Sequence, residues 1–506
     1  MTEKRLKIND LQILTGINIL LLIFRILWVL YGNIHLNSDE AQYWLWSRQP
    51  DLSYYSKPPM IAYANYLSTW LLGDTEIGIR INAILIGFML PIIQYKLVMN
   101  LFNDKKTAFW SVIILFSMPH YHYLSMIFTT DSLVYLFWSL AILLSWKAMQ
   151  SNQWKYWILS GITLGLGIIS KYTMLIWVPS FVLIGWTENR NLLKMSRFYT
   201  SLLIAFIICI PVLYWNLSQD FVGVKHILGL MGAYKPPVPL PRSVGKMFIY
   251  VAGQLACLSP FYIPALILIF RKWKNKELNN DLKPLNFLLI PIILVWGLFF
   301  ILSFKKNYMN WTFFAFTSIP VLIAYSVVRF FNSKKRIMPT VLTSLIVSLL
   351  LFPQLFDLTG LKSLYPPHID LYHKQTGWKE LGGHVSKIWE GTGTDSTFIF
   401  SDNYHISAEL AFYVDNQPQT YCINDGRRMN QFDLWPGIEQ FSGKGFGAIY
   451  VSFNPIPDWL EQSFQKTKLV KIQSRLYREC EIKSPFFIYQ LSGFKNFNTT
   501  TEPSGY

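Results

Sequence analysis

Long apolar runs are the feature of this sequence that most limits the folds open to it. Eleven runs that reach or approach the length of a membrane span lie before residue 357. An α-helix needs about 20 apolar residues to cross about 30 Å of hydrocarbon, and in lipid its backbone polar groups must be paired within the segment. The expected spans are 11–31, 78–101, 107–119, 132–149, 155–169, 171–187, 199–217, 246–270, 286–303, 311–330 and 338–356. The sequence therefore predicts a polytopic, all-α membrane domain with about 11–13 transmembrane helices.

The charged residues agree with this interpretation. They make up 15% of the chain, against about 25% in soluble domains, and the mean hydropathy is +0.29. The net charge of +16 lies in the first 357 residues, which carry 31 Lys and Arg against 14 Asp and Glu, whereas the remainder carries 14 against 15. Many of these bases fall in short loops between apolar runs. The charge therefore indicates membrane topology and argues against nucleic-acid binding.

The basic loops also orient the chain in the membrane. When the N-terminus is placed in the cytoplasm, every loop on that side is basic, from NDKK to NSKKR. An odd number of spans then places the tail on the outer side. The tail contains the β-rich segments STFIFSD, QTYCIN, GAIYVSF and FFIYQL between helical or turn-like stretches. We expect a transmembrane domain over residues 1–357 and a soluble α/β domain over residues 358–506.

The stretch NSDEAQYWLWSRQPDLSYYSKPPM, residues 37–60, follows the first span on the outer side. Asn37 or Ser38 is suited to cap a short helix that begins near Asp39, and acids are favourable in the first turn of a helix. A helix lying at the membrane interface would explain the tyrosines and tryptophans by itself. It explains the acids only in part, because a further outer acid, Asp131, opens another span.

Basic residues accompany these acids on the outer face. Lys57 precedes Pro58, which restricts the backbone before it and favours an extended conformation at the lysine. Lys171 lies between two short apolar halves, where it either serves the site or snorkels to the interface. Arg242 lies in a long outer loop. Acids and bases on one face, next to lipid, suit a substrate that carries a phosphate at the membrane surface.

A lipid-linked sugar phosphate is a donor that meets these requirements. The chain has no GxGxxG motif, no complete P-loop and no D-x-D pair of the kind that nucleotide-sugar transferases carry. The glycosyl–phosphate bond stores the driving force for transfer, and lysine or arginine stabilises the charge that a departing phosphate gains. A carboxylate can act as the base toward an attacking hydroxyl group.

Five stretches, in order SDEAQYWLW, YYSKPPM, TTDSLVYLFW, SKYTMLIWVP and NYMNWTFFAF, resemble the motifs of the bacterial GT-C glycosyltransferases. These enzymes are relatives of the protein O-mannosyltransferases and of the lipid A aminoarabinose transferase, and the resemblance is to glycosyltransferase family 39. The tail segment SDNYHISAELAFYVDNQPQTYCINDGRRMNQFDLWPG extends it to residues 37–437. The resemblance implies a GT-C fold, a periplasmic active-site cavity and a polyprenyl-phosphate sugar donor.

The resemblance also implies roles for individual residues. Asp39 matches the catalytic-loop aspartate, and Glu40 is its acidic neighbour; both are expected to be catalytic, together with Asp131. Asp131 matches the aspartate of a T-P-D motif, in which this chain has Thr130 in place of the proline. Lys57 matches the lysine of a K-P-P motif that is associated with the donor phosphate. The residues expected to bind the donor phosphate or another part of the substrate are Tyr54, Tyr55, Lys57, Lys171, Tyr172 and Arg242.

We therefore expect a multi-pass protein of the bacterial inner membrane with a cytoplasmic N-terminus and a periplasmic C-terminal domain. It would move a sugar from polyprenyl (undecaprenyl) phosphate to lipid A or another envelope glycan. The sugar is not identified, and phosphate and hydroxyl acceptors both stay open, with the K-P-P motif favouring phosphate. A transporter or flippase for lipid-linked glycans is disfavoured because the acids gather at one surface and no repeat is visible. An O-antigen-type ligase is disfavoured by the ordered motifs.

Two further sets of residues allow more than one interpretation. His120 and His122 form, with Asp131, a set that can bind a divalent metal, although paired histidines near an interface are more often polar aromatic residues. The sequence requires no cofactor. Cys422 and Cys480 both lie in the outer domain, where a disulfide between them is open.

Other polar and small residues point to structure rather than chemistry. Gly161 and Gly165 form a G-x-x-x-G pair, which predicts close packing of two helices. Arg25 lies inside the first span and needs a partner that the sequence does not identify. Arg427 and Arg428 lie in the outer domain with Asp433, where they either contact an acceptor or pair with neighbouring acids, and the structural role is favoured.

Overall fold

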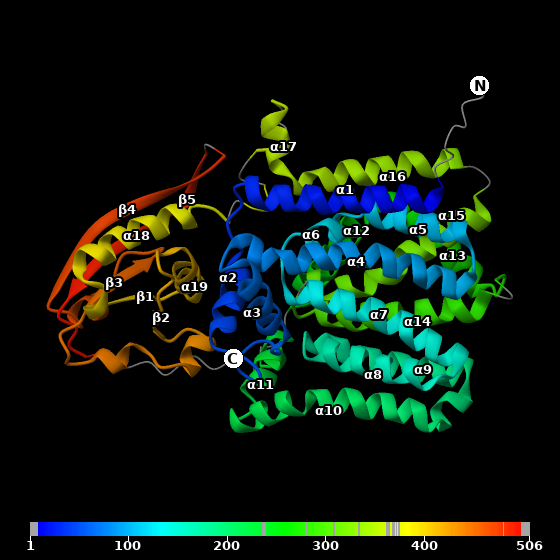
Figure 1. The fold of residues 1–506 in the computed structure, drawn as a ribbon, viewed down its shortest axis with the longest axis horizontal. Coiled ribbons are helices and arrows are strands. Elements are labelled where there is room, and N and C mark those ends of the chain that lie inside the picture. Colours follow the sequence, from blue (N-terminus) through cyan, green and yellow to red (C-terminus); the bar gives the residue numbers. More distant parts are fainter. Residues whose placement is uncertain are drawn as a thin grey trace.

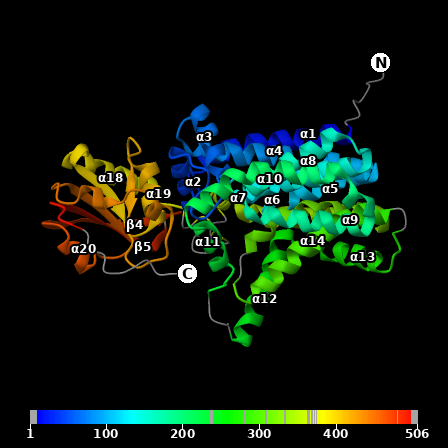
Figure 2. The same ribbon diagram turned by 90° about the horizontal axis from the view of Figure 1, so that it is seen from below.

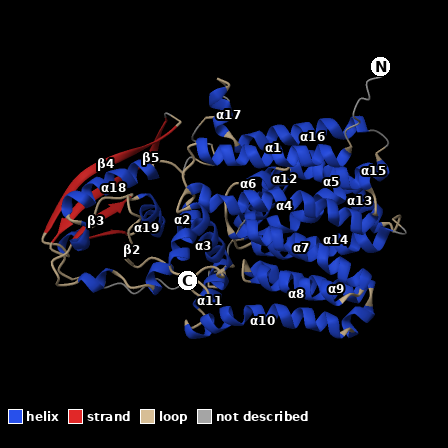
Figure 3. Ribbon diagram, in the orientation of Figure 1, coloured by secondary structure: helices blue, strands red, loops and turns tan. Residues whose placement is uncertain are grey.

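The chain folds into a helical bundle with a sheet domain packed against one end of it (Figure 1). This computed structural model describes residues 9–234, 239–278, 281–306, 309–331, 334–360, 365–366, 370, 372, 375–478 and 480–496. The described strands all lie in the C-terminal domain (Figure 3). The first two residues of the NYMNWTFFAF motif, 307 and 308, lie outside the described residues.

Among the described residues, six helical segments are long and apolar enough to cross a membrane. They are α1 (Asp10–Tyr31), α4 (Glu76–Phe102), α7 (Thr130–Ser151), α10 (Ser196–Ser218), α14 (Leu282–Ser303) and the segment Asn310–Phe330, formed by η5 (Met309–Ser318) and α15 (Ile319–Phe330). A bent pair adds a seventh: α12 (Leu240–Leu258) is followed, after a bend of 85°, by the helical segment Pro260–Lys274, which ends in α13 (Ile263–Lys274). The chain is a multi-pass membrane protein.

The other expected spans coincide with shorter helices. These are α5 (Lys105–Ser117), α8 (Trp154–Ile168), α9 (Trp177–Glu188) and α16 (Lys334–Ser348). At 1.5 Å per residue they are about 18–23 Å long, less than the hydrocarbon thickness of about 30 Å. The described part of the chain therefore has six or seven full-length spans where the sequence predicted about eleven.

Two structural predictions for the bundle can be followed in side-chain contacts. A Cβ atom on Gly161 of α8 would lie 2.5 Å from the carbonyl oxygen of Ser201 on α10, and one on Gly165 would lie 2.8 Å from the Cβ of Ile208. Only glycine allows so close an approach, which confirms the close helix packing.

Arg25 is buried in the bundle and has an aromatic partner. Its guanidinium lies over the ring of Tyr121, 4.7 Å from the ring centroid. A cation placed over an aromatic face is stabilised by the ring quadrupole, more strongly where water is excluded. Tyr121 is therefore the partner that the sequence did not identify.

Short helices cover the end of the bundle that faces the C-terminal domain (Figures 1 and 2). They include α2 (Ser38–Arg48), α3 (Met60–Leu72) and α11 (Val222–Leu230). α2 begins as predicted, because the side chain of Asn37 accepts a hydrogen bond from the Asp39 N–H at 2.9 Å, and the Asn37 N–H donates to the Glu40 carboxylate at 2.9 Å. This reciprocal capping box defines the start of the helix.

The aromatic residues of α2 lie inside the protein, so the prediction that they occupy the membrane interface is wrong. Tyr43, Trp44 and Trp46 are at most 3% exposed. Trp44 packs edge-to-face on Phe412 of the C-terminal domain, with ring centroids 5.0 Å apart. α2 is thus enclosed between the bundle and the C-terminal domain.

The C-terminal domain is a five-stranded mixed sheet with helices on it. The strand order is β2-β1-β3-β5-β4; β1 pairs in parallel with β2 and β3, whereas β5 is antiparallel to β3 and β4. The bounds are α18 (Trp378–Thr392), β1 (Thr397–Ser401), α19 (Tyr404–Tyr413), β2 (Thr420–Cys422), β3 (Gly447–Ser452), α20 (Asp458–Gln462), β4 (Lys466–Tyr477) and β5 (Cys480–Ser492). α18 and α19 pack on one face around Trp378, Leu410 and Ile449. The expected α/β domain is confirmed.

Cys422 and Cys480 are both free, so no disulfide joins them. Cys422 ends β2 at one edge of the sheet, and Cys480 begins β5. β1 and β3 lie between these two strands, and two cysteines so separated cannot meet the short Cβ–Cβ distance of a disulfide.

The remaining short elements connect these parts. They are α6 (Pro119–Leu124), η1 (Tyr172–Ile176), η2 (Arg190–Lys194), η3 (Pro260–Tyr262), η6 (Leu349–Leu351), α17 (Pro353–Leu358), η9 (Thr394–Ser396), η10 (Gln431–Leu434) and η11 (Ile438–Phe441). The C-terminal domain is held to the bundle by polar contacts as well as by α19 on α2. The hydroxyl of Tyr413 accepts a hydrogen bond from the Leu36 N–H at 2.7 Å and donates to Glu76 at 2.5 Å.

Candidate active site

A polar cavity of about 360 Å³ lies where the bundle, its short outer helices and the C-terminal domain meet. Residues from α2, from the loop before α3, from the start of α7 and from α11 line it together with residues of the C-terminal domain. The lining residues are Asn37, Asp39, Gln42, Tyr43, Tyr55, Ser56, Lys57, Tyr123, Thr129, Thr130, Asp131, Lys171, His226, Leu230, Asn310, Trp311, Tyr404, Arg428, Met429 and Asn430. The structure therefore brings Asp39, Asp131, Lys57, Lys171 and Tyr55 together, as the sequence predicted.

The adjacent acids of α2 point to different surroundings. Asp39 is exposed and lines the cavity. Glu40 is fully buried and does not line it; its two oxygens accept hydrogen bonds from Arg80 at 3.1 and 2.9 Å. A third hydrogen bond comes from the Phe128 N–H at 2.9 Å. Glu40 therefore anchors α2 to the bundle, and only Asp39 is available to a substrate.

Asp131 and Lys171 form a buried ion pair at the wall of the cavity. The Lys171 ammonium lies 2.5 Å from one carboxylate oxygen of Asp131, and Asn310 donates to the other oxygen at 3.0 Å. Both charged residues are 6% exposed, and the ammonium also lies over the ring of Trp311 at 5.8 Å. Because Lys171 is paired inside the protein, it does not snorkel to the interface.

Lys57 is a cation of the cavity that has no anionic partner among the described residues. Its backbone is held by a hydrogen bond from the Tyr54 N–H to the Lys57 carbonyl oxygen at 3.1 Å. Its ammonium makes no hydrogen bond or ion pair with any residue in the described part of the chain. Burial lowers the pKa of Lys57, and repulsion from Lys171 lowers it further, against the opposing effect of Asp39 and Asp131. A buried ammonium group favours the binding of an anion, because the negative charge stabilises the protonated form that burial destabilises.

An apolar pocket of about 250 Å³ adjoins the polar cavity. Ser56, Lys57, Lys171, Leu230 and Trp311 line both, so the two spaces meet at the two lysines. The rest of the apolar pocket is formed by Pro58, Tyr172, Thr173, Leu175, Ile176, Ile227, Met231, Leu298, Phe299 and Leu302. Tyr172, predicted to bind substrate, thus lies in the apolar pocket. The arrangement can hold an amphipathic molecule whose anionic group lies at the junction.

Two predicted substrate-binding residues lie away from these spaces. Tyr54 is buried, stacks on Trp46 with ring centroids 4.7 Å apart, and its hydroxyl lies 3.0 and 3.1 Å from the carbonyl oxygens of Trp46 and Gln49. Arg242 is exposed on α12 and lines neither space. Their direct contact with substrate is not supported by these positions.

The two histidines of the candidate metal set are engaged elsewhere. His120 contacts the carbonyl oxygen of Cys257 and the hydroxyl of Tyr135, each at 3.3 Å, and His122 contacts the carbonyl oxygen of Phe116 at 2.7 Å. In the described residues no group of three or more His, Cys, Asp or Glu side chains is placed to hold a metal ion. The set of His120, His122 and Asp131 therefore does not assemble.

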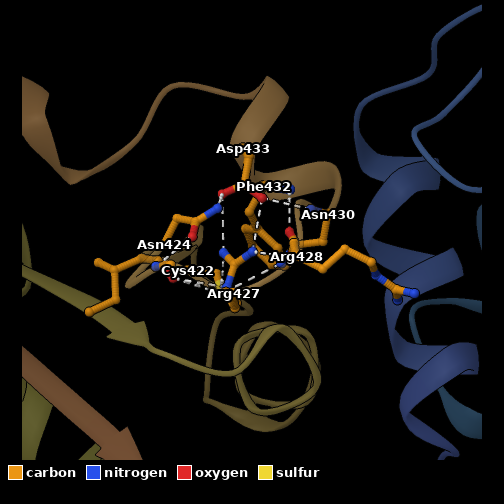
Figure 4. A network of polar contacts seen from close by, with 9 residues as sticks. Cys422, Asn424, Arg427, Arg428, Asn430, Phe432 and Asp433 are labelled. Carbon is orange, nitrogen blue, oxygen red and sulfur yellow. Dashed lines mark hydrogen bonds and ion pairs between the residues drawn. The ribbon is translucent and has the colours of Figure 1, made fainter. Parts of the chain in front are cut away.

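The C-terminal domain supplies cavity residues that sequence reasoning missed. Tyr404, Arg428, Met429 and Asn430 line the cavity, although Arg428 was expected to be structural. Its neighbour Arg427 has that role, with hydrogen bonds of 2.9 and 3.1 Å to Asp433. Arg428 extends away from this network toward the helices of the bundle (Figure 4). The only signal in the sequence was that the tail segment shared the family resemblance.

Known proteins resemble this chain in sequence and in fold. Residues 56–215 match the family described as dolichyl-phosphate-mannose-protein mannosyltransferase. The lipid A galacturonosyltransferase of Rhizobium johnstonii is 26% identical over 378 residues, which cover 74% of this chain and 77% of the relative. This chain is a glycosyltransferase that is similar to the ArnT and protein mannosyltransferase enzymes.

Two further comparisons show similar proteins. The undecaprenyl phosphate-alpha-4-amino-4-deoxy-L-arabinose arabinosyl transferase of Erwinia tasmaniensis is 24% identical over 187 residues, which cover 33% of the glycosyltransferase and 34% of the relative. The crystal structure of ArnT from Cupriavidus metallidurans bound to undecaprenyl phosphate matches with a TM-score of 0.64 at 12% identity, over 97% of the glycosyltransferase and 100% of that chain. This structural likeness shows a shared fold.

The family match covers only part of the glycosyltransferase cavity. Lys57, Asp131 and Lys171 fall within residues 56–215. Asp39 precedes that range, and Arg428 follows it. The cavity is therefore built both from the matched region and from segments on either side of it.

Proposed function

We propose that the glycosyltransferase moves a sugar from polyprenyl phosphate to lipid A or another envelope glycan, at the periplasmic face of the bacterial inner membrane. The observation that carries this proposal is the junction of the polar cavity with the apolar pocket at Lys57 and Lys171. A polyprenyl-phosphate sugar has the same division, with an apolar chain, one anionic phosphate and a polar sugar. The phosphate lies beside Lys57, the polyprenyl chain begins in the apolar pocket, and the sugar enters the polar cavity.

The relatives support the same classes of donor and acceptor. Lipid A appears in the name of the Rhizobium enzyme, and undecaprenyl phosphate appears in that of the Erwinia enzyme. The Cupriavidus ArnT structure has undecaprenyl phosphate bound. These assignments extend to the glycosyltransferase as part of the proposal.

The transfer breaks the bond between the anomeric carbon of the sugar and the phosphate oxygen, and forms a bond from that carbon to an acceptor oxygen. The departing polyprenyl phosphate gains a negative charge, which the ammonium of Lys57 stabilises. If the acceptor is a hydroxyl group, Asp39 takes its proton as the general base. If the acceptor is a phosphate, its oxygen is already anionic near neutral pH, and Asp39 orients the donor sugar instead. The proposal favours phosphate, on the basis of the Lys57-Pro58 motif.

The direct test is product analysis with purified protein in lipid nanodiscs. Labelled polyprenyl-phosphate sugars are incubated with lipid A, and the products are identified by mass spectrometry. We expect transfer by the wild type and a loss of at least about 10²-fold in Asp39→Asn, because Asp39 is the free carboxylate of the cavity. Asp415→Asn is the matched control, since Asp415 is exposed on the C-terminal domain and lines neither space. Turnover of Asp39→Asn at the wild-type rate would contradict the assignment of Asp39.

The acceptor is distinguished by the pH dependence of the wild-type rate between about pH 5 and 8. A phosphate monoester has a second pKa near 6, so the rate rises as a phosphate acceptor ionises. Converting that phosphate to a methyl ester should remove most of the dependence. A product with the new sugar on a ring hydroxyl group would reject the phosphate acceptor and make Asp39 the general base.

A further inference from the structure

Arg428 is positioned at the cavity by contacts that reach both domains. Beside it, Arg427 is locked by its two hydrogen bonds to Asp433. Three residues further on, Gln431 is 2% exposed and accepts a hydrogen bond from the backbone N–H of Tyr55 at 2.7 Å. The loop that carries Arg428 is therefore hydrogen-bonded to its own domain through Arg427 and to the loop that carries Lys57 through Gln431.

The guanidinium of Arg428 is exposed at the cavity and has no anionic partner. No hydrogen bond or ion pair joins its side chain to any residue for which the structure gives a position. It lies close enough to act electrostatically on Lys57, whose pKa it lowers, and on Tyr404. Figure 4 shows the side chain directed away from the Arg427 network and toward the bundle.

The charges around the cavity do not balance without substrate. Asp131 and Lys171 neutralise each other in their ion pair. Asp39, Lys57 and Arg428 remain, one carboxylate and two cations. A sugar linked through a phosphodiester brings one negative charge, which Lys57 accommodates and which cancels the net charge of these three residues. Arg428 still has no direct anionic contact, because no ion pair joins it to Asp39 or to another acid of the described residues.

The two free cations also occupy different parts of the site. Lys57 lines both the polar cavity and the apolar pocket, so it lies where a lipid phosphate must sit. Arg428 lines the polar cavity only. Any anion that Arg428 binds is therefore on the side of the transferred sugar or the acceptor, away from the start of the polyprenyl chain.

We propose that Arg428 is a specificity-determining residue that binds a second anionic group of the substrates, distinct from the donor phosphate. The group is an oxyanion with paired oxygens, which matches the planar fork of a guanidinium. Two sources supply this chemistry: a carboxylate on the transferred sugar, as in a uronic acid, or a phosphate on the acceptor. This inference rests on the proposed function, because it assigns a role within the same cavity.

The test compares substrates that differ only in the second anion. Donors are polyprenyl-phosphate galacturonic acid, its neutral counterpart polyprenyl-phosphate galactose, and polyprenyl-phosphate 4-amino-4-deoxyarabinose. Acceptors are lipid A with two phosphates and its monophosphoryl form, which keeps one phosphate to accept the sugar. Each combination is assayed with the wild type, Arg428→Gln, Arg428→Lys and the control Lys444→Gln, which removes a charge from an exposed turn of the same domain. Thermal unfolding of each variant shows whether it is folded.

We expect Arg428→Gln to raise KM by about tenfold or more for the substrate that carries the second anion, since a hydrogen-bonded charge contributes about 1.5–3 kcal/mol. KM for the matched substrate without that anion stays unchanged, as does every constant of Lys444→Gln. Arg428→Lys recovers part of the lost affinity, because lysine keeps the positive charge but lacks the planar pair of N–H donors. A penalty confined to galacturonic acid identifies the sugar carboxylate, and one confined to lipid A with two phosphates identifies a phosphate of the acceptor.

Other outcomes contradict the inference. An equal penalty for all substrates, including those without a second anion, means that Arg428 supports the fold or the leaving phosphate. No penalty for any substrate means that Arg428 binds nothing in the reaction. In both cases wild-type transfer leaves the proposed function intact. Absence of transfer by the wild type from every polyprenyl-phosphate donor contradicts the proposed function, and the inference about Arg428 falls with it.

Discussion

At the scale of single residues, Lys57 shows how the cavity is prepared for an anion. An ammonium group loses hydration when it is buried, and that cost is offset only by a nearby negative charge. The nearest fixed anions, Asp39 and Asp131, oppose the lowering of its pKa but do not reverse it. One of the two, Asp131, is already paired with Lys171. In the proposed function, the donor phosphate supplies the missing charge.

The lowered pKa of Lys57 predicts how donor binding depends on pH. The ammonium is present below its pKa and is lost as the pH rises through it, at a lower pH than for an ordinary lysine with a pKa of about 10.4. Affinity for undecaprenyl phosphate should therefore weaken as the pH rises, and it should do so below the pH at which an ordinary lysine loses its charge. Equilibrium binding in nanodiscs measures this, with Lys57→Arg as the comparison, because arginine keeps its charge where lysine loses it. Identical pH profiles for wild type and Lys57→Arg would show that Lys57 is not the titrating group.

At the scale of elements, α2 carries two neighbouring acids that face different surroundings. Successive residues of an α-helix point about 100° apart, so Asp39 and Glu40 cannot face the same surroundings. Asp39 faces the cavity, whereas Glu40 meets Arg80 of α4 in an ion pair with both side chains at most 2% exposed. Arg80 also donates to the carbonyl oxygens of Ile34 and His35, which fixes the chain that leads into α2. The ion pair thus positions the helix that carries Asp39.

Removing one charge of this pair should destabilise the protein more than it impairs the chemistry. Glu40→Gln leaves Arg80 buried without a counter-charge, and we expect a loss of about 3–5 kcal/mol in the free energy of unfolding. The double variant Glu40→Gln/Arg80→Met removes both charges and should recover part of that loss. Unfolding in detergent and turnover below the unfolding transition are measured together. If folded Glu40→Gln were as inactive as Asp39→Asn, Glu40 would have to act on the substrate.

At the scale of the whole molecule, the site exists only because two domains meet. The bundle contributes the acids, the lysines and the apolar pocket, and the C-terminal domain contributes Tyr404, Arg428 and Asn430. The domains are held together by α19 on α2 and by the hydrogen bond between Gln431 and Tyr55. The C-terminal domain therefore lies on the same side of the membrane as the cavity.

The native cysteines allow the side of the membrane to be tested. Cys480 is exposed in the C-terminal domain, whereas Cys209 and Cys422 are buried and Cys257 is partly buried. We expect a membrane-impermeant maleimide to label Cys480 in cells whose outer membrane alone has been permeabilised. Cys480→Ser should lose the label. Labelling that appears only after the inner membrane is broken would place the domain in the cytoplasm and reverse the proposed orientation.

Features that depend on neighbouring residues were predictable from the sequence. The apolar runs predicted membrane helices because a span needs continuous apolar length, and the capping box at Asn37 and Glu40 lies within four residues. Gly161 and Gly165 predicted close packing because their spacing places both on one helix face. The count of spans was less predictable, because the apolar composition of a segment does not state whether its helix continues across the whole bilayer or bends, as α12 and α13 do.

Features that depend on residues distant in sequence were decided by the tertiary structure. The sequence placed Asp131 and Lys171 on the outer side but not in one ion pair, and it gave Glu40 a catalytic role beside Asp39. It treated Arg428 as structural, whereas packing of the C-terminal domain on α2 brings this residue to the cavity. Residue types and spacing encode the interactions within a helix turn. Which charges face one another across a cavity is determined by how the elements pack, because only packing brings distant side chains within the few ångströms over which ion pairs form.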